Sequence, residues 1–206
     1  MAVNGHAGSF DKTSRGDSIS RGMENLQYCL IDTVIGPVGL VVSGNGLVWI
    51  ELRCPPEEIF IREIEKRYRA NVGADQRVRP KADRAAETGA HTGAPLQEAT
   101  REIMKYLEGK SRLVGIPLDL RGPDFMIRVC REMMKIPYGR TATYGEIAGR
   151  IDRPGAARAV GRAVGKNPLP IIIPCHRVIG AGGKLTGFGS GLDLKAHLLD
   201  LEKKTM

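Results

Sequence analysis

The sequence has 206 residues, which suffices for one large domain or for two small domains that share a core. Its hydrophobic content of 42% is typical of a globular interior, and no run approaches the ~18 consecutive apolar residues of a transmembrane helix. The first residues also lack the apolar stretch of a secretory signal. We therefore expect a soluble protein without a membrane partner, located in the cytoplasm or, in a eukaryote, in the nucleus.

The formal net charge is +8, and most of it lies in one segment. Between Arg121 and Asn167 there are ten Lys and Arg residues against four acidic residues, a net charge of +6. Charge gathered in one part of a chain suits a polyanion such as nucleic acid better than charge scattered for solubility.

The N-terminal part predicts a small α/β domain. Residues 1–25 are polar and rich in Gly and Ser, so we expect a disordered tail. In residues 38–52, two β-branched runs flank an Asn-Gly pair, which predicts a β-hairpin. The segment after Pro55 and Pro56 predicts an amphipathic helix, because Phe60, Ile64 and Tyr68 recur at helical spacing.

The rest of the N-terminal part predicts three further segments. Residues 71 to about 94 are polar and are expected to form a linker or long loop. A helix over 96–108 should end at Gly109, and a short strand should follow over 112–120. Residues 26–120 are thus expected to form an α/β domain with a small antiparallel sheet and helices.

The C-terminal part, residues 121–206, predicts a mainly helical domain. Asp124 is expected to cap a helix that presents Phe125, Val129 and Met133 on one face. Thr143 and Glu146 fit a capping box that opens a short helix over 143–151.

A second short helix is expected over 155–166, after a three-residue break. The two short helices are typical either of a DNA-binding helix-turn-helix or of two packed helices with a solvated basic face. The second helix has almost no bulky side chains, which costs helix stability. Its small residues indicate a close approach, either to DNA or to another helix in the core.

Four cysteines, Cys29, Cys54, Cys130 and Cys175, form no C-x-x-C pair, and His is sparse. The spacing gives no support for a metal site or a dissociable cofactor. Free buried thiols are the expected state of three of them, with Cys130 in the core.

Cys175 differs because it follows an apolar run, Ile171–Ile173, and Pro174. His176 and Arg177 come next, so a rigidly held thiol would lie beside a base and a cation, an arrangement that predicts a lowered thiol pKa. A buried structural cysteine beside two surface residues remains the alternative.

The segment Pro174-Cys-His-Arg-Val178 resembles the active-site signature of the O6-alkylguanine-DNA alkyltransferases, also called methylated-DNA–protein-cysteine methyltransferases. Further blocks match that family in order and spacing. They are residues 136–140, 143–148, 157–160, 167–168 and 186–192. The resemblance is close over 122–203 and looser over 26–120, where the family has a ribonuclease-like α/β domain.

The resemblance implies a suicide transferase. Cys175 would take the alkyl group from O6 of a guanine, once and irreversibly, without a cofactor. His176 would deprotonate the thiol through a bound water, and Glu202 would orient His176. The sequence supports Glu202 independently, because it follows an apolar helical stripe at the flank of the buried face, on a helix expected to be capped by Asp193.

The resemblance also implies roles at the DNA. Tyr144 would crowd the target phosphate and donate to the leaving guanine, and Arg158 would fill the place of the flipped nucleotide. Thr143, Ala157 and Arg162 would complete a minor-groove interface. The substrate pocket would consist of Asn167, Arg177, Val178, Phe188 and Gly189, with the backbone carbonyls of Cys175 and Val178 reading the guanine amino group. The expected partner is double-stranded DNA that contains O6-alkylguanine, bound by a monomer.

Three positions depart from the family pattern. Phe188 stands where many members have tyrosine, Gly189 where some have serine, and Cys130 where a tryptophan is common. None of these changes removes the proposed chemistry, although Gly189 bears on tolerance of bulky alkyl groups.

Three other functions compete with this interpretation. A lesion sensor that only binds alkylated DNA resembles the same family but carries tryptophan at the position of Cys175. A sequence-specific regulator would need side chains that reach base edges, which the small-residue helix lacks. A Cys-His hydrolase is disfavoured, because adjacent residues cannot easily place an imidazole against the thiol.

Overall fold

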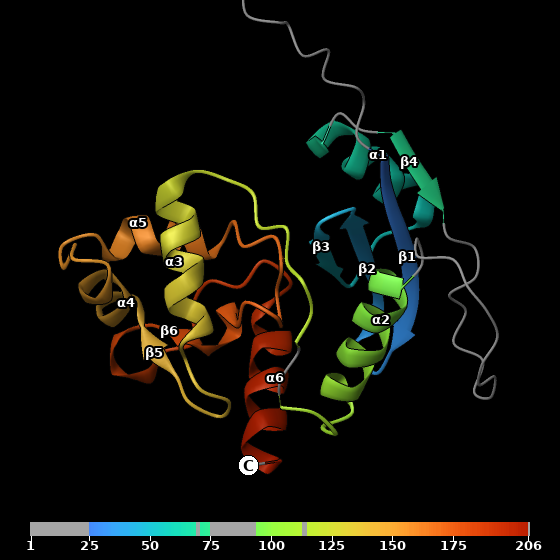
Figure 1. Cartoon of the computed structure of the whole chain (residues 1–206). Coiled ribbons are helices and arrows are strands. Elements are labelled where there is room, and N and C mark those ends of the chain that lie inside the picture. Colours follow the sequence, from blue (N-terminus) through green and yellow to red (C-terminus); the bar gives the residue numbers. More distant parts are fainter. Residues whose placement is uncertain (1–24, 69–70, 75–93, 113–114, 206) are drawn as a thin grey trace, which may run out of the picture.

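The computed structural model describes residues 25–68, 71–74, 94–112 and 115–205. The tail expected over 1–25 lies outside these residues except for its last position. An N-terminal α/β part stands beside a C-terminal helical part, and helix α6 (Leu192–Lys204) lies between the two (Figure 1). This arrangement confirms the fold class expected from the sequence.

A four-stranded sheet with the order β3-β2-β1-β4 forms the centre of the N-terminal part. The antiparallel neighbours are β1 (Asn25–Thr33), β2 (Gly36–Ser43) and β3 (Gly46–Leu52). The predicted hairpin is confirmed, since β2 and β3 meet at a tight turn over residues 44–45.

The fourth strand corrects the linker expected over 71 to about 94. Its first residues form β4 (Asn71–Ala74), which pairs parallel to β1. The pattern missed it because an open sheet edge pairs with backbone groups and needs no apolar side chains. The rest of the expected linker, 75–93, lies outside the described residues.

Two helices cover opposite faces of the sheet. Helix α1 (Glu57–Tyr68) buries Phe60 and Ile64 on one face, and α2 (Ala94–Leu107) buries Ile103 on the other. Both predicted helices are therefore confirmed. Burial on two faces explains why β2 and β3 are apolar almost throughout.

The strand predicted over 112–120 is absent from the described residues of that range, 112 and 115–120. Among them only Leu118 forms a bridge, to Leu47, flanked by hydrogen bonds from Leu47 N to Pro117 O and from Asp119 N to Leu47 O. Pro117 has no amide hydrogen, so it cannot donate to a ladder that would lengthen this bridge.

The C-terminal part contains α3 (Asp124–Met134), α4 (Tyr144–Arg150) and α5 (Ala157–Val164). The expected capping box is present, with Thr143 Oγ1 accepting from Glu146 N. Asp124 does not cap α3. Pro123 takes the cap position, and Asp124 lies in the first turn, where its charge suits the helix dipole.

Two short elements fix the segment after α5. The 3₁₀ turn η1 (Cys175–Arg177) leads into β6 (Val178–Ile179), which pairs parallel to β5 (Ala142–Thr143). The start of α4 is therefore tied to the turn that carries Cys175. A second 3₁₀ turn, η2 (Ala181–Gly183), precedes α6.

Helix α6 buries Leu194 and Leu198, as the apolar stripe predicts. Its cap is Gly191, which corrects the expectation that Asp193 caps it. Asp193 is the second residue of the helix and pairs instead with Arg53, which directly follows β3.

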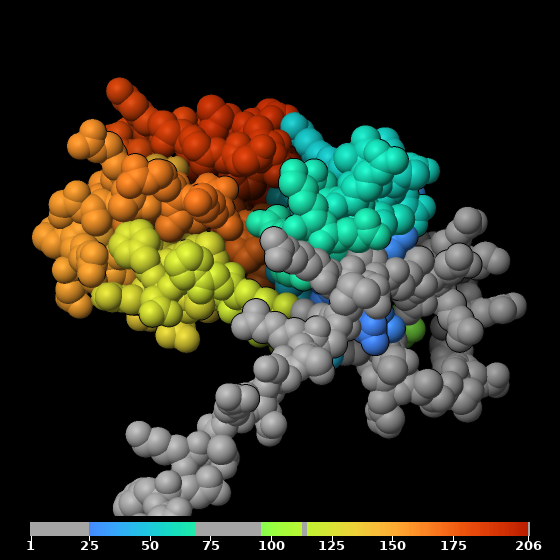
Figure 2. Space-filling model, turned by 90° about the horizontal axis from the view of Figure 1, so that it is seen from above, coloured from blue at the N-terminus to red at the C-terminus, as the bar shows by residue number. Residues whose placement is uncertain are grey.

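One cluster of buried apolar side chains runs through both parts of the molecule. It joins Leu40 and Ile50 of the sheet to Val129 of α3, Val160 of α5 and Leu198 of α6. Seen from above, the N-terminal residues around β3 and α1 lie directly against the C-terminal part (Figure 2). The two parts therefore share a core.

Gly46 sets the contact between β3 and the segment that follows α2. Its φ is +137°, and an added Cβ would lie 2.4 Å from Pro117 O. We expect Gly46→Ala to lower the free energy of unfolding by about 2 kcal/mol, because both backbone strain and a backbone clash oppose it. Gly44→Ala is the matched control, since nothing lies within 4 Å of its Cβ position. Equal urea midpoints for the two variants would refute this account.

Candidate active site

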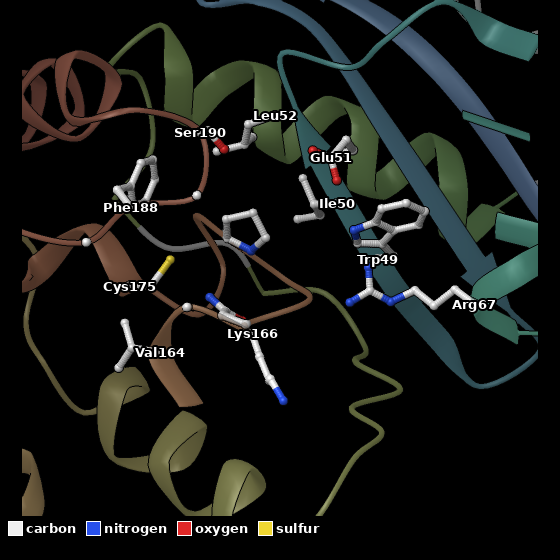
Figure 3. Close-up of a pocket in the computed structure, with 15 residues that line it drawn as sticks. Trp49, Ile50, Glu51, Leu52, Arg67, Val164, Lys166, Cys175, Phe188 and Ser190 are labelled. Atoms are coloured by element: carbon white, nitrogen blue, oxygen red, sulfur yellow. The ribbon is translucent and has the colours of Figure 1, made fainter. Parts of the chain in front are cut away.

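A pocket of about 210 Å³ opens between the two parts of the molecule. Cys175 and Phe188 face it from the C-terminal part, and Trp49, Ile50 and Glu51 of β3 line the opposite side (Figure 3). Of the predicted pocket residues, Asn167, Phe188 and Gly189 line it, together with Cys175. The β3 side was not predicted, because a buried apolar strand carries no signal of a substrate site.

Two predicted pocket residues lie elsewhere. Val178 is fully buried in β6, and Arg177 turns away from the pocket into the interior. Neither side chain lines the pocket. The contact expected of Val178 is through its backbone carbonyl, which here accepts a hydrogen bond from Lys195 Nζ. Arg177 is drawn away by a buried carboxylate, a partner that the local sequence could not reveal.

Asn167 braces the loop that leads to Cys175. Its Nδ2 donates to Ile173 O at 2.8 Å, and its Oδ1 accepts from Leu169 N at 3.0 Å. Within this loop, Ile171 has a φ of +75°, a conformation that costs free energy for a β-branched residue. The apolar run is buried at Ile171 and Ile173 and half-buried at Ile172.

The thiol of Cys175 does not have the lowered pKa that the sequence predicted. Burial raises the pKa of Cys175, while a hydrogen bond from Asn167 and the charge of Lys195 oppose that rise. The prediction failed because the thiol is only 5% exposed and because Arg177 points to another partner. A neutral thiol is therefore the resting state, and a base must remove its proton.

His176, the residue after Cys175, forms a buried pair with Glu202, and both side chains are 0% exposed. His176 Nε2 lies 2.9 Å from Glu202 Oε1. His176 Nδ1 is buried and has no hydrogen-bond partner among the described residues. The turn η1 therefore carries Cys175 and, directly after it, a histidine whose Nδ1 has no hydrogen-bond partner in the described part of the chain.

Glu202 accepts hydrogen bonds from several segments. Arg177 donates from Nη2 at 2.7 Å and from Nε at 3.0 Å, and Gly139 N donates at 2.9 Å. Arg177 Nη1 donates to Ile136 O at 2.7 Å, which anchors the guanidinium. The sequence predicted that an acid at the flank of the buried face needs a partner. In the structure Glu202 forms a buried ion pair with Arg177.

The protonation states of this pair follow from their surroundings. Burial would raise the pKa of Glu202, but hydrogen bonds from His176 and Arg177 outweigh it and lower that pKa to about 2. Burial lowers the pKa of His176, against the opposing effect of Glu202. At neutral pH the pair is therefore a carboxylate and a neutral imidazole.

Lys195 is a site residue that sequence reasoning missed. It is 0% exposed, and its Nζ donates to Val178 O and to Thr186 O. It thereby joins β6 to the loop that carries Phe188, and its charge lies near the thiol. Its position seven residues before Glu202, on the same helix face, was the available signal.

Tyr144 stands at the start of α4 and contacts the same loop. Its hydroxyl donates to Thr186 O at 3.0 Å. A Cβ on Gly187 would lie 3.1 Å from that hydroxyl. Gly187 lines the pocket, so the Tyr144 hydroxyl lies next to a residue of the pocket wall.

The predicted DNA-contact residues lie on the surface of the helix pair. Arg158 and Arg162 are exposed on α5, while Thr143 and Ala157 are partly exposed at the starts of α4 and α5. Beyond this, no helix in the described ranges is long and apolar enough to cross a membrane. Nor do three or more His, Cys, Asp or Glu side chains gather there in a way that could hold a metal ion.

The chain is similar to known proteins of one family. A family model described as the DNA-binding domain of 6-O-methylguanine DNA methyltransferase matches residues 124–204. A methylated-DNA–protein-cysteine methyltransferase of Methanosarcina acetivorans is 51% identical over 177 residues, which cover 86% of this chain and 98% of that protein. A Mycobacterium bovis protein of the same name is 42% identical over 178 residues, which cover 86% of this chain and 93% of that protein. The chain belongs to the methylated-DNA–protein-cysteine methyltransferase family.

A solved structure supports the membership. The crystal structure of Mycobacterium tuberculosis OGT in complex with DNA superposes with a TM-score of 0.69 at 38% identity, covering 87% of this chain and 94% of that one. The likeness to this family member extends over both parts, including the N-terminal α/β part that the family model leaves out.

The buried carboxylate should make stability depend on pH. Folding lowers the pKa of Glu202 from 4.5 to about 2, so its ionised form stabilises the fold by about 3 kcal/mol above pH 5. This contribution disappears as the pH falls from about 5 to about 2. Glu202→Gln should be less stable at pH 7, because Arg177 loses its partner, and should lose less stability on acidification.

Urea unfolding from pH 7 to pH 3 measures both effects. Glu108→Gln, which removes an exposed carboxylate, serves as the control and should follow the wild-type pH dependence. Parallel curves for wild type and Glu202→Gln would contradict the assignment.

Proposed function

We propose that this chain reverses alkylation damage by moving the alkyl group from O6 of guanine in double-stranded DNA to Sγ of Cys175. The family to which the chain belongs supports direct-reversal DNA repair by a methylated-DNA–protein-cysteine methyltransferase. The position of Cys175 on the pocket, next to the buried His176–Glu202 pair, is the observation that carries the choice of residue.

The first step is removal of the thiol proton. Because burial keeps Cys175 neutral, a base must act, and His176 is neutral with a free Nδ1. A water between the thiol and Nδ1 would relay the proton. Glu202 would then stabilise the imidazolium that forms, as a carboxylate already hydrogen-bonded to Nε2.

The second step is displacement at the alkyl carbon. The thiolate forms the S–C bond while the C–O6 bond breaks, and guanine leaves with the electron pair. Tyr144 would turn its hydroxyl hydrogen from Thr186 O to the departing base, which is otherwise a poor leaving group. Phe188 would form one wall for that base, and the open space at Gly189 leaves room near the alkyl group.

The helix pair would hold the DNA. Gly161 and Gly165 of the α5 region are not demanded by packing, since added Cβ atoms would lie 3.8 Å and 3.5 Å from their nearest neighbours. Close approach to DNA is then the better reason for small residues there, and it suits a minor groove. Arg158, exposed at the start of α5, would replace the flipped guanosine in the base stack.

The thioether that forms on Cys175 has no route back to a thiol within this site. We therefore propose one turnover per molecule, performed by a monomer, because one chain holds the thiol, the base and the DNA-contacting helices. We also propose that the boundary near residue 120 separates the α/β domain from the domain that binds DNA and accepts the alkyl group.

Intact mass spectrometry after incubation with a duplex that contains O6-methylguanine tests the reaction. We expect a single added methyl group on Cys175, at one equivalent and no more. Cys175→Ala should gain none, whereas Cys130→Ala should still be methylated, because Cys130 is a core residue with 0% exposure.

Two outcomes would overturn the proposal. Binding of the lesion duplex without added mass would favour a lesion-binding protein. Repair of more than one equivalent would exclude a suicide reaction.

A second experiment separates base flipping from chemistry. Arg158→Ala should react at least about tenfold more slowly with the duplex, because nothing then offsets the lost stacking of the flipped base. The same variant should react with free O6-methylguanine base at the wild-type rate. Arg131→Ala, an exposed cation on α3, is the control. Equal losses on duplex and free base would contradict the role of Arg158.

A further inference from the structure

Tyr106, a residue of the N-terminal part, contacts both members of the His176–Glu202 pair through its hydroxyl. It lies on α2, the helix that packs on the sheet, and its side chain is 1% exposed. Its hydroxyl oxygen lies 2.5 Å from Glu202 Oε1 and 3.2 Å from His176 Nε2. No other described residue of the N-terminal part is hydrogen-bonded to this pair.

The single hydroxyl hydrogen of Tyr106 goes to the carboxylate. A carboxylate only accepts hydrogen bonds, and the bond to it is the shorter and charge-assisted one. Burial and the nearby charge of Glu202 raise the pKa of Tyr106, so the phenol stays protonated. The lone pairs of the phenol oxygen are therefore free to face His176.

This arrangement leaves His176 with one acceptable tautomer. Both groups near Nε2, the Tyr106 oxygen at 3.2 Å and Glu202 Oε1 at 2.9 Å, act as acceptors toward the ring. Nε2 must then carry the hydrogen, and Nδ1 keeps its lone pair. Nδ1 is the ring nitrogen that is buried and without a partner in the described part of the chain.

We propose that Tyr106 is a positioning residue of the active site, whose hydroxyl holds Glu202 in place and fixes the Nε2–H tautomer of His176. The inference rests on the proposed function and deepens it. Through Tyr106 the N-terminal part helps to set the base that receives the Cys175 proton.

The experiment compares wild type with Tyr106→Phe and with Tyr138→Phe. Tyr138 packs edge-on against Tyr106, with ring centroids 6.1 Å apart, but its hydroxyl bonds to Thr205. Each variant thus removes one hydroxyl from the same aromatic pair, a buried one at Tyr106 and a half-buried one at Tyr138. Of the two hydroxyls, that of Tyr106 is the one bonded to Glu202. Thermal unfolding checks that each variant is folded.

The first readout is the single-turnover rate of methyl transfer over a range of pH. We expect Tyr106→Phe to be slower by about tenfold, the rate equivalent of one charge-assisted hydrogen bond, with unchanged affinity for DNA. Tyr138→Phe should keep the wild-type rate.

The acid limb of the rate profile should move as well. The charged groups that face His176 are Glu202 and Lys195 on α6 and Arg177 on η1, with the Tyr106 phenol from α2. Without the phenol, less of the charge on Glu202 is neutralised, so the imidazolium is favoured and the pKa of His176 rises. Neutral His176 is then lost at a higher pH, and the limb shifts toward neutrality.

The second readout does not depend on methyl transfer. The ¹⁵N spectrum of the imidazole of His176, assigned with a His176→Gln variant, reports the tautomer and its titration. We expect the Nε2–H tautomer in wild type and in Tyr138→Phe, and a higher His176 pKa in Tyr106→Phe.

An Nδ1–H tautomer in wild type would overturn the inference, as would an unchanged rate and titration in Tyr106→Phe. Equal effects in Tyr138→Phe would also overturn it, by showing a merely structural role. If Cys175 accepts no methyl group, the rate measurement fails with the proposed function, whereas the ¹⁵N spectra still decide the role of Tyr106.

Discussion

The carboxylate of Glu202 holds the candidate active site together. It is fully buried on α6 and accepts hydrogen bonds from α2, from the loop after α3 and from the turn η1. An unpaired carboxylate at this depth would be very costly, so these partners stabilise the docked position of α6. The same pairing draws Arg177 inward and orients His176. Stability and the geometry of the base therefore depend on one interaction.

Burial of the thiol follows from the same packing and shapes the proposed chemistry. The pocket encloses Cys175 so fully that its pKa rises, which favours the neutral thiol. Asn167 and Lys195 oppose the rise, and both also fix the loops on either side of the pocket. A thiol of this kind is protected from adventitious reaction and becomes nucleophilic only with a base beside it. His176, neutral and held by Glu202, suits that role.

The sequence predicted most of the fold and a large part of the site, and its failures have physical causes. Periodicity and turn chemistry sufficed for the hairpin, for α1 and for the capping box at Thr143, because these signals are local. Whether residues 71–74 and 112–120 form strands depends on which backbone groups at a sheet edge are available for pairing. A local sequence pattern does not contain that information. Arg177 and Tyr106 were missed as partners of Glu202 for the same reason, since their contacts span 25 and 96 residues of sequence.

The proposed single-turnover reaction would place unusual demands on a protein. A site that turns over must release product and restore its nucleophile, which favours loops that move. A site used once needs only to reach the reactive geometry, so its network can be buried, ionic and satisfied from several segments. This molecule has such features: a core shared by both parts, the buried Arg177–Glu202 pair, and Tyr106 of α2 bonded to Glu202. In the proposed reaction the cost of rigidity would fall on the substrate, because the guanine would have to leave the duplex to reach the thiol. The small-residue face of α5 and the exposed Arg158 are the features proposed to offset that cost.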